Sequence, residues 1–179
     1  CDCTVGPVNG FASDRRFYEA IMAGDIGFLD PICASLENAM LQLKPAAILT
    51  DPMEYFNPLH DLANTLADIL ITNAAKRGQK ISKLVYANEY PELYEADEAA
   101  ITRVLTSGEQ FAQRRRLEAY TPLHAEWKRM EADGKLASMH IEKLFPDPVR
   151  LGSIPPARET RFKSAFYEDY GRAAVKKGT

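Results

Sequence analysis

AAILTDPMEYFNPLHDLANTLADILITNAAKRGQKISKLVYA, residues 46–87, contains a strand, a loop, a helix and a second strand in succession. Residues 46–50 form a compact apolar run of strand length, and a run that is apolar on both faces is typical of a buried parallel strand. Residues 59–73 carry apolar side chains at i, i+3, i+4 spacing, which predicts a helix that ends near residues 76–78. Residues 81–87 return to a β pattern.

This order of elements predicts the fold class. A helix of this length is long enough to serve as the crossover between two parallel strands, and such crossovers are right-handed. The sequence therefore predicts an α/β fold: a Rossmann-like, mostly parallel sheet flanked by helices. The carboxyl-terminal third is expected to be helical and irregular.

Two helices are expected ahead of this unit. Either Ser13 or Asp14 is the predicted N-cap of the first helix, and Gly24 ends it. Asp30 is the predicted N-cap of the second helix, with Pro31 as its first residue, a position where proline costs no hydrogen bond.

The sequence after residue 87 favours helices. Residues 97–105 are expected to be helical, and a further helical run extends from residue 108 to residue 130, with Arg114, Arg115 and Arg116 on its solvated side. Prolines stud residues 145–156, which indicates irregular backbone. Four aromatic residues near the carboxyl end are expected to contribute packing, rather than a substrate crevice or a subunit contact: Phe162, Phe166, Tyr167 and Tyr170.

Length, charge and cysteine count narrow the class of protein. With 179 residues and a balanced composition, residues 1–179 are expected to form a single α/β domain. The formal charge of −3 has the wrong sign for holding nucleic acid by charge. Charged residues interrupt every apolar stretch well short of a membrane span, so no membrane partner is expected. Three cysteines make a disulfide framework improbable, which favours the cytoplasm.

The loop from Asp51 to Asp61 occupies the position where α/β proteins bind ligands, the carboxyl end of a strand. Within it, Asn57 can cap the following helix, Pro58 fits the first helical position, and His60 falls in the first turn. A helix amino terminus favours the neutral imidazole, which is the form that binds a metal ion. The same residues also make a good helix start without any chemistry, so both interpretations stand at this point.

Histidine content limits what spacing alone can establish. A catalytic zinc ion takes three protein ligands and an open position, and the chain has three histidines in all. His124 and His140 lie far from the loop in sequence, and neither has a second histidine four residues away. The spacing is compatible with a ligand site but names no reaction.

Residues 51–61 after an apolar strand resemble the second metal motif of the PIG-L and LmbE-like family, zinc-dependent N-deacetylases of N-acetylglucosamine derivatives and related amides. Residues 166–177 are similar to the Tyr-Glu-x-x-Gly segment and basic helix near the end of many members. Residues 97–103 also fit the place of a helix in those proteins. The resemblance covers most of the chain.

The resemblance implies a metal-dependent amide hydrolase acting on a small N-acylated substrate, with zinc as its cofactor. His60 matches the zinc ligand of the second motif. Asn57 stands where many members have a histidine that polarises the amide oxygen; its amide NH₂ can donate a hydrogen bond there but cannot become a cation. The family's other zinc ligands, a His and an Asp, and its general base come from an amino-terminal His-Pro-Asp-Asp-Glu motif.

That amino-terminal motif is absent from these 179 residues. Residues 3–10 resemble the strand and glycine-containing loop that follow the first β-α unit in the family, so the chain is expected to begin one such unit late. It would be either the carboxyl-terminal part of a hydrolase or an inactive member that serves as a sugar-binding or scaffolding subunit. Since a missing strand leaves an open sheet edge, a second copy or a chain that supplies the missing unit is an expected partner. A nucleotide binder is disfavoured because no glycine-rich phosphate loop is present.

Overall fold

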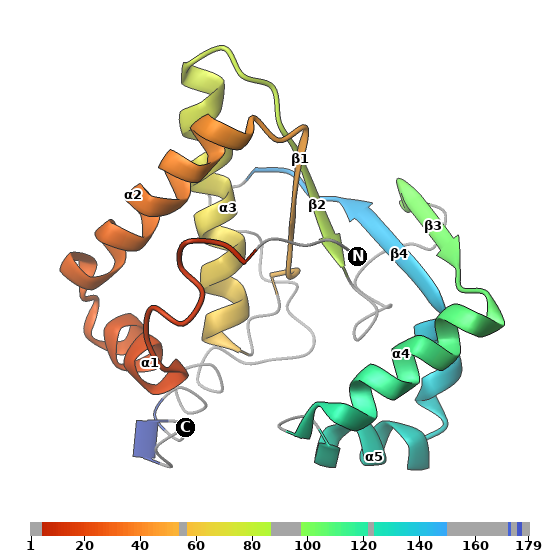
Figure 1. The fold of residues 1–179 in the computed structure, drawn as a ribbon. Coiled ribbons are helices and arrows are strands. Elements are labelled where there is room, and N and C mark those ends of the chain that lie inside the picture. The colour runs from red at the N-terminus through yellow and green to blue at the C-terminus, as the bar shows by residue number, and fades with distance from the viewer. Residues whose placement is uncertain are drawn as a thin grey trace. The chain divides into compact units, whose positions relative to one another are not determined.

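The computed structural model describes residues 5–53, 57–86, 98–121, 124–149, 172 and 175–176. The chain divides into two compact units (Figure 1). The first unit comprises Cys1–Leu84 and Asp147–Thr179, and the second comprises Val85–Pro146. The expectation of a single domain stays a prediction.

Among the described residues, four strands form one mixed sheet, which confirms the α/β class. The strands are β1 (Ala47–Thr50), β2 (Ser82–Tyr86), β3 (Ile101–Val104) and β4 (Ile141–Pro146), and their order in the sheet is β1-β2-β4-β3. Strands β3 and β4 are antiparallel, with Ile101 opposite Leu144 and Val104 opposite Ile141.

The first unit contains the helices α1 (Asp14–Ala23), α2 (Ile26–Leu43) and α3 (Pro58–Lys76), and both α1 and α2 contact α3. The predicted ends of α1 are confirmed. The Ser13 hydroxyl accepts a hydrogen bond from the Arg16 N–H, and Gly24 ends the helix in the left-handed conformation at φ 63°. Glycine reaches that conformation without the steric cost that a Cβ imposes.

The predicted start of α2 at Asp30 is wrong. The helix begins at Ile26, and Asp25 is its N-cap, because the Asp25 carboxylate accepts the Phe28 N–H at 3.0 Å. The same carboxylate accepts a hydrogen bond from the Arg16 guanidinium at 2.5 Å. These two bonds, that of Arg16 first, lower the pKa of Asp25. Pro31 lies inside the helix, one turn beyond its start.

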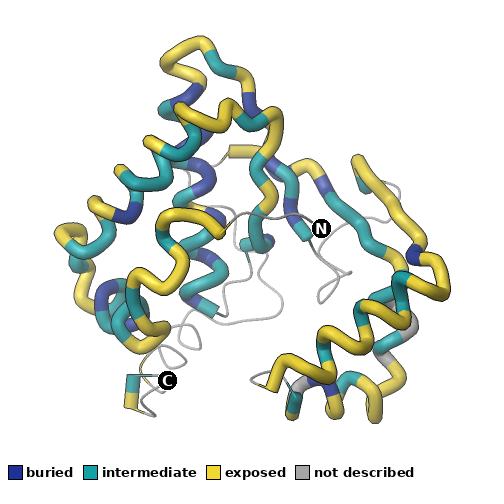
Figure 2. The backbone as a smooth tube through the Cα atoms, in the orientation of Figure 1, coloured by how far each residue is buried: buried dark blue, intermediate teal, exposed yellow. Residues whose placement is uncertain are grey.

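The apolar core of the first unit lies between α3 and the sheet. Ile71, Ala74 and Ile81 are buried together, and Met40 and Ile48 pack against them. Figure 2 shows buried segments along α3. The predicted apolar stripe of this helix is mostly half-buried, whereas its fully buried face also carries polar residues. The buried residues of α3 are Pro58, Asp61, Asn64, Ala67, Asp68, Leu70, Ile71 and Ala74.

Strand β1 is not buried on both faces, so that part of the prediction is wrong. Its residues alternate between exposed and half-buried, and Leu49 is 56% exposed while Ile48 packs inward. The reason is position: β1 lies at the end of the strand order, where α3 contacts it.

The second unit contains α4 (Ser107–Ala119), α5 (His124–Ala132) and the short 3-10 helix η4 (Lys135–His140), besides β3, β4 and the end of β2. The helix predicted over residues 97–105 is wrong, because residues 101–104 form β3 and pair with β4. The predicted helical run up to residue 130 is present as two helices, and Arg114, Arg115 and Arg116 are exposed as expected. The buried core here is Val85 and Phe145, with Ala99 against them.

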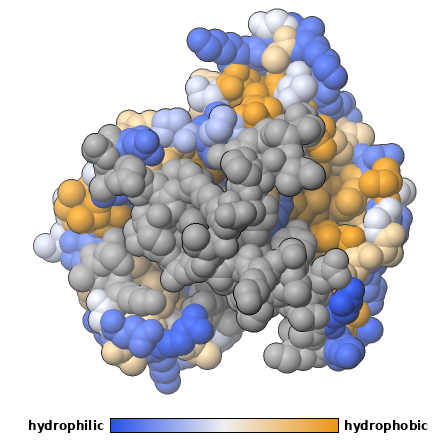
Figure 3. Space-filling model, turned by 180° about the vertical axis from the view of Figure 1, so that it is seen from behind, coloured by the Kyte–Doolittle hydropathy of each residue, from blue (hydrophilic) through white to orange (hydrophobic). Residues whose placement is uncertain are grey.

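Among the described residues, no helix is both long and apolar enough to cross a membrane. Large apolar side chains do reach the surface, and Figure 3 shows apolar areas interspersed with polar ones on one face. The aromatic group at Phe162, Phe166, Tyr167 and Tyr170 lies outside the described residues, as do residues 3 and 4 and most of the segment 166–177.

Candidate functional site

The loop after β1 leads into α3 through the predicted cap. Asn57 has extended backbone (φ −98°, ψ 111°), and its Oδ1 accepts the N–H of Leu59 at 3.0 Å. Pro58 is the first helical residue, where a backbone N–H would have no partner within the helix, so the missing N–H of proline costs no hydrogen bond. Pro58 is also buried. Both predictions about this helix start are confirmed, while residues 54–56 of the loop lie outside the described part of the chain.

A second donor fixes the orientation of the Asn57 amide. Tyr18 is a buried residue of α1, and its hydroxyl donates a hydrogen bond to Asn57 Oδ1 at 3.2 Å. Because a backbone N–H can only donate, the atom that faces Leu59 has to be the carbonyl oxygen of the amide, and the NH₂ group has to point the other way. The Asn57 Nδ2 has no hydrogen-bond partner within the described residues. The site thus presents two fixed N–H donors.

His60 lies in the same turn of α3 as the Asn57 cap. It is the third residue of the helix and is half-buried, and the buried Asp61 follows it. The structure therefore places both predicted site residues, Asn57 and His60, at the amino-terminal end of α3.

The described residues do not fit a complete zinc site. A catalytic zinc takes three protein ligands, and no group of three His, Cys, Asp or Glu side chains in the described ranges could hold a metal ion. His124 in α5 and His140 in η4 belong to the second unit. His60 is the one ligand that the resemblance assigns to a described residue.

A buried polar cluster, the Lys83 cluster, contacts the start of this loop and was not predicted. Its members are Lys83 from β2, Asn64 and Asp68 from α3, and Asp147 after β4. The Lys83 Nζ lies 2.7 Å from Asn64 Oδ1, 2.6 Å from Asp68 Oδ1 and 2.8 Å from Asp147 Oδ2. The Lys83 side chain is 1% exposed. The contact with Asn64 is a hydrogen bond and the two with the carboxylates are ion pairs, so three oxygen atoms surround the ammonium group.

Asn64 connects the Lys83 cluster to the loop. Its Oδ1 accepts from Lys83, and its Nδ2 donates to the backbone carbonyl of Asp51 at 2.7 Å. Asp51 is the residue that follows β1, and Asn64 itself is fully buried. This chain of two hydrogen bonds fixes the start of the loop that leads to Asn57.

The Lys83 cluster buries three charged side chains. Two carboxylates, Asp68 and Asp147, share one ammonium group, and all three side chains are at most 5% exposed. Burying charges costs several kcal/mol each, and removal of one partner from a buried pair typically costs about 3–5 kcal/mol. The cluster is therefore a strong constraint on which residues can occupy these positions.

Two features of the sequence could have indicated the Lys83 cluster. Asn64 and Asp68 are four residues apart, so they share one face of the helix. Lys83 alternates with Ile81 and Val85, which places it on the buried face of β2 by the period of a strand. An apolar-periodicity search passes over both because it treats polar residues as solvated.

Comparison with protein-family models, with curated proteins and with solved structures found no match.

Proposed function

We propose that this chain is part of a metal-dependent amide hydrolase, an N-deacetylase that acts on an N-acetylated sugar or a related small amide. The observation that carries the proposal is the Asn57 amide, which the Leu59 N–H and the Tyr18 hydroxyl hold in one orientation beside His60. The resemblance of residues 51–61 to the second metal motif of the PIG-L and LmbE-like family supports the same assignment.

Asn57 would act on the carbonyl oxygen of the substrate. When water attacks an amide carbonyl, negative charge develops on that oxygen, and an N–H donor already aimed at it stabilises the transition state. Loss of one such donor costs about 10²–10³ in kcat. His60 offers one imidazole ligand to a metal ion, and the remaining ligands and the base for the attacking water would come from residues other than the described ones.

The proposal includes the finer fold. We infer a Rossmann-like, mostly parallel sheet built around β1, α3 and β2. The 19 residues of α3 are long enough for a crossover, and the Ser82 N–H donates to the Ala46 carbonyl at 3.0 Å, next to the first residues of both strands. In such a sheet the loop after β1 lies at the ligand-binding edge.

Partner and compartment complete the proposal. The position of β1 at the end of the strand order and the exposed Leu49 support a partner strand, supplied by a second copy or by a chain that carries the first β-α unit. We place the protein in the cytoplasm. Cys33 is a free thiol, and burial raises its pKa, which makes it less reactive there.

Metal content and amine release test the proposed function. The natural protein that contains this sequence should retain zinc after dialysis and release free amine from N-acetylglucosamine. His60→Ala should lose the zinc and the activity. Asn57→Ala should keep the zinc but lower kcat about 10²-fold. His124→Ala, a histidine of the second unit, is the matched control and should change neither.

Two results would decide against this assignment. Zinc content that is unchanged in His60→Ala would remove His60 from the ligand set. Binding of N-acetylglucosamine without any amine release, with or without added zinc, would favour the inactive sugar-binding subunit.

A further inference from the structure

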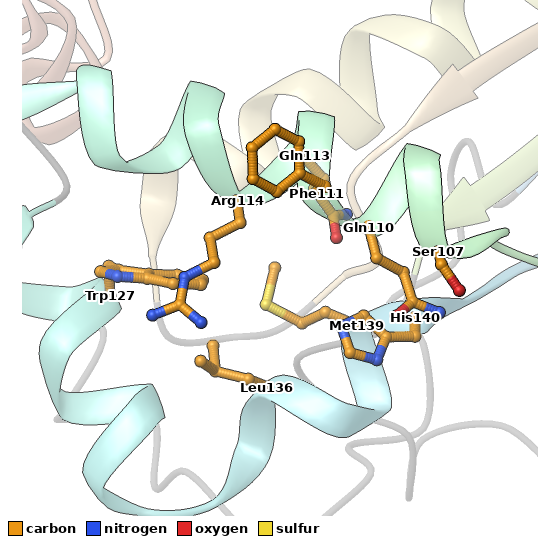
Figure 4. A pocket seen from close by; sticks show the side chains of 9 residues that line it. All are labelled: Ser107, Gln110, Phe111, Gln113, Arg114, Trp127, Leu136, Met139 and His140. Atoms are coloured by element: carbon orange, nitrogen blue, oxygen red, sulfur yellow. The ribbon is translucent and has the colours of Figure 1, made fainter.

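A cavity of about 270 Å³ lies within the second unit, among α4, α5 and η4. Figure 4 shows its side chains: those of α4 along the top, Trp127 of α5 on the left, and those of η4 below. The lining residues are Ser107, Gln110, Phe111, Gln113, Arg114, Trp127, Leu136, Met139 and His140. Pockets for drug-sized ligands begin at about 300 Å³, so this cavity suits a small ligand of one or two rings.

Its walls are apolar and aromatic. Trp127 is 8% exposed and forms one wall, and the Met139 thioether points into the centre of the cavity (Figure 4). Phe111 is 66% exposed at the rim. A thioether contacts aromatic rings favourably but is only a weak hydrogen-bond acceptor. Hydroxyl groups of a bound sugar would therefore lack partners against Leu136 and Met139, whereas a flat aromatic ring carries its polar atoms on its edge.

The Arg114 guanidinium at the cavity is already paired with two carboxylates. The Arg114 guanidinium lies 3.0 Å from Glu118 Oε1 and 3.1 Å from Glu131 Oε1. A third anion there would add to two carboxylates, so a phosphate group is not favoured. The ligand is expected to be uncharged.

Polar side chains remain available at the edge of the cavity. Ser107, Gln113 and His140 make no side-chain hydrogen bond to any described residue, whereas Gln110 Nε2 is used by the Leu105 carbonyl at 2.8 Å. The Gln113 amide offers a donor and an acceptor side by side, the pattern that pairs with the edge of adenine.

We infer that this cavity binds an uncharged heteroaromatic ring, the base of a purine nucleobase or nucleoside, stacked on Trp127 and hydrogen-bonded through Gln113. The ribose of a nucleoside would lie outside the apolar walls, toward the exposed rim. Stacking of a base on an aromatic side chain and a bidentate amide contact each contribute substantially to affinity. The inference does not rest on the proposed amide hydrolase, because none of the lining residues belongs to the first unit.

Trp127 makes the test direct, because it is the one tryptophan of the chain. The full chain is titrated with adenosine while tryptophan fluorescence is followed at an excitation wavelength that adenosine does not absorb. The expected result is a saturable change with half-saturation near about 1 mM or below. AMP should bind no more tightly than adenosine, and N-acetylglucosamine should leave the fluorescence unchanged.

Variants locate the binding. Phe111→Ala and Gln113→Ala should each raise the half-saturating adenosine concentration at least about fivefold. Arg115→Ala, on the same helix but outside the cavity lining, is the matched control and should bind as the unchanged chain does. Circular dichroism of each variant shows that α4 is still folded.

Several outcomes would overturn the inference. One is the absence of a saturable response to adenosine up to about 10 mM, and another is a saturable response to N-acetylglucosamine. The third is adenosine binding by Phe111→Ala and Gln113→Ala that is as tight as binding by the unchanged chain. His60→Ala should keep the adenosine response, so failure of the hydrolase proposal and failure of this inference give different results.

Discussion

The Lys83 cluster of the first unit and the cavity of the second unit use polar side chains in opposite ways. In the cluster, three oxygen atoms surround one ammonium group through a hydrogen bond and two ion pairs, and the side chains are almost fully buried. Around the cavity, Ser107, Gln113 and His140 have polar atoms with no partner among the described residues. Satisfied buried groups hold a fold together, whereas open ones are available to a ligand.

The helices of the two regions also differ in how far they are buried. Eight residues of α3 are fully buried, but within α4 none is (Figure 2). The position of α3 is fixed by packing and by the Lys83 cluster. That of α4 depends more on its cap and on surface ion pairs, which contribute little each.

Lys83→Met should give the largest loss of stability. It removes the charge that Asp68 and Asp147 share and leaves two buried carboxylates together, so the free energy of unfolding should fall by about 3–5 kcal/mol. Urea denaturation measures the change. Lys80→Met, an exposed lysine three residues earlier, is the control and should change stability by less than about 0.5 kcal/mol. Similar midpoints for both variants would show that the cluster is not a determinant of stability.

Asn64→Ala should have the second largest effect. The variant removes the acceptor of one Lys83 hydrogen bond and the donor that binds the Asp51 carbonyl. Each buried polar group that is left without a partner costs about 1–3 kcal/mol. Amide hydrogen exchange at Asp51 and Met53 should also accelerate, because the start of the loop loses its hydrogen bond to α3. Thr65→Ala, the exposed neighbour, should leave exchange at these residues unchanged.

Thr106→Ala should cost less, about 1 kcal/mol, because it removes the N-cap of α4. The Thr106 hydroxyl accepts the Glu109 N–H, and the Glu109 carboxylate accepts the Thr106 N–H at 2.9 Å, which forms a capping box. Thermal unfolding followed by helical circular dichroism measures the loss. Thr121→Ala, an exposed threonine beyond the helix, should leave the transition where it is.

The smallest effect should be a pH dependence at the same cap. The backbone hydrogen bond from Thr106 is the main reason that the pKa of Glu109 is lowered, and the Arg103 guanidinium also contributes. A lowered pKa in the folded chain means that the stabilisation is complete above the ordinary Glu pKa of about 4.3 and is lost as the pH falls through the folded value. Glu109→Gln should remove this dependence, which NMR of the α4 amides in an acid titration can detect.

The local signals of the sequence predicted the first unit well. Ser13 and Asn57 cap the start of a helix with a side-chain oxygen, and Gly24 ends a helix because it reaches the left-handed conformation. These are local properties, and all three residues act as predicted. Asp30 failed because Asp25 provides a cap five residues earlier, supported by Arg16 from α1. That support comes from another helix, and periodicity within one segment does not contain it.

Long-range pairing explains the larger errors. Residues 101–104, Ile-Thr-Arg-Val, are rich in β-branched side chains, but their strand exists because residues 141–146 pair with them 40 positions away. The error about the burial of Leu49 has the same cause, because an apolar run does not reveal whether its strand lies at the centre or the edge of a sheet. The helix start predicts Asn57 as a cap, and the family resemblance assigns Asn57 and His60 to the site. Neither signal contains Tyr18, which orients Asn57 and lies 39 residues away.

The burial of Lys83 has a consequence for protein chemistry. Amine-acylating reagents and trypsin need an accessible lysine, and Lys44 and Lys80 are exposed while the Lys83 side chain is not. In the folded chain Lys83 should remain unmodified when those two lysines have reacted. Its modification, read by mass spectrometry, would then count the molecules whose first unit has opened, without any engineered probe.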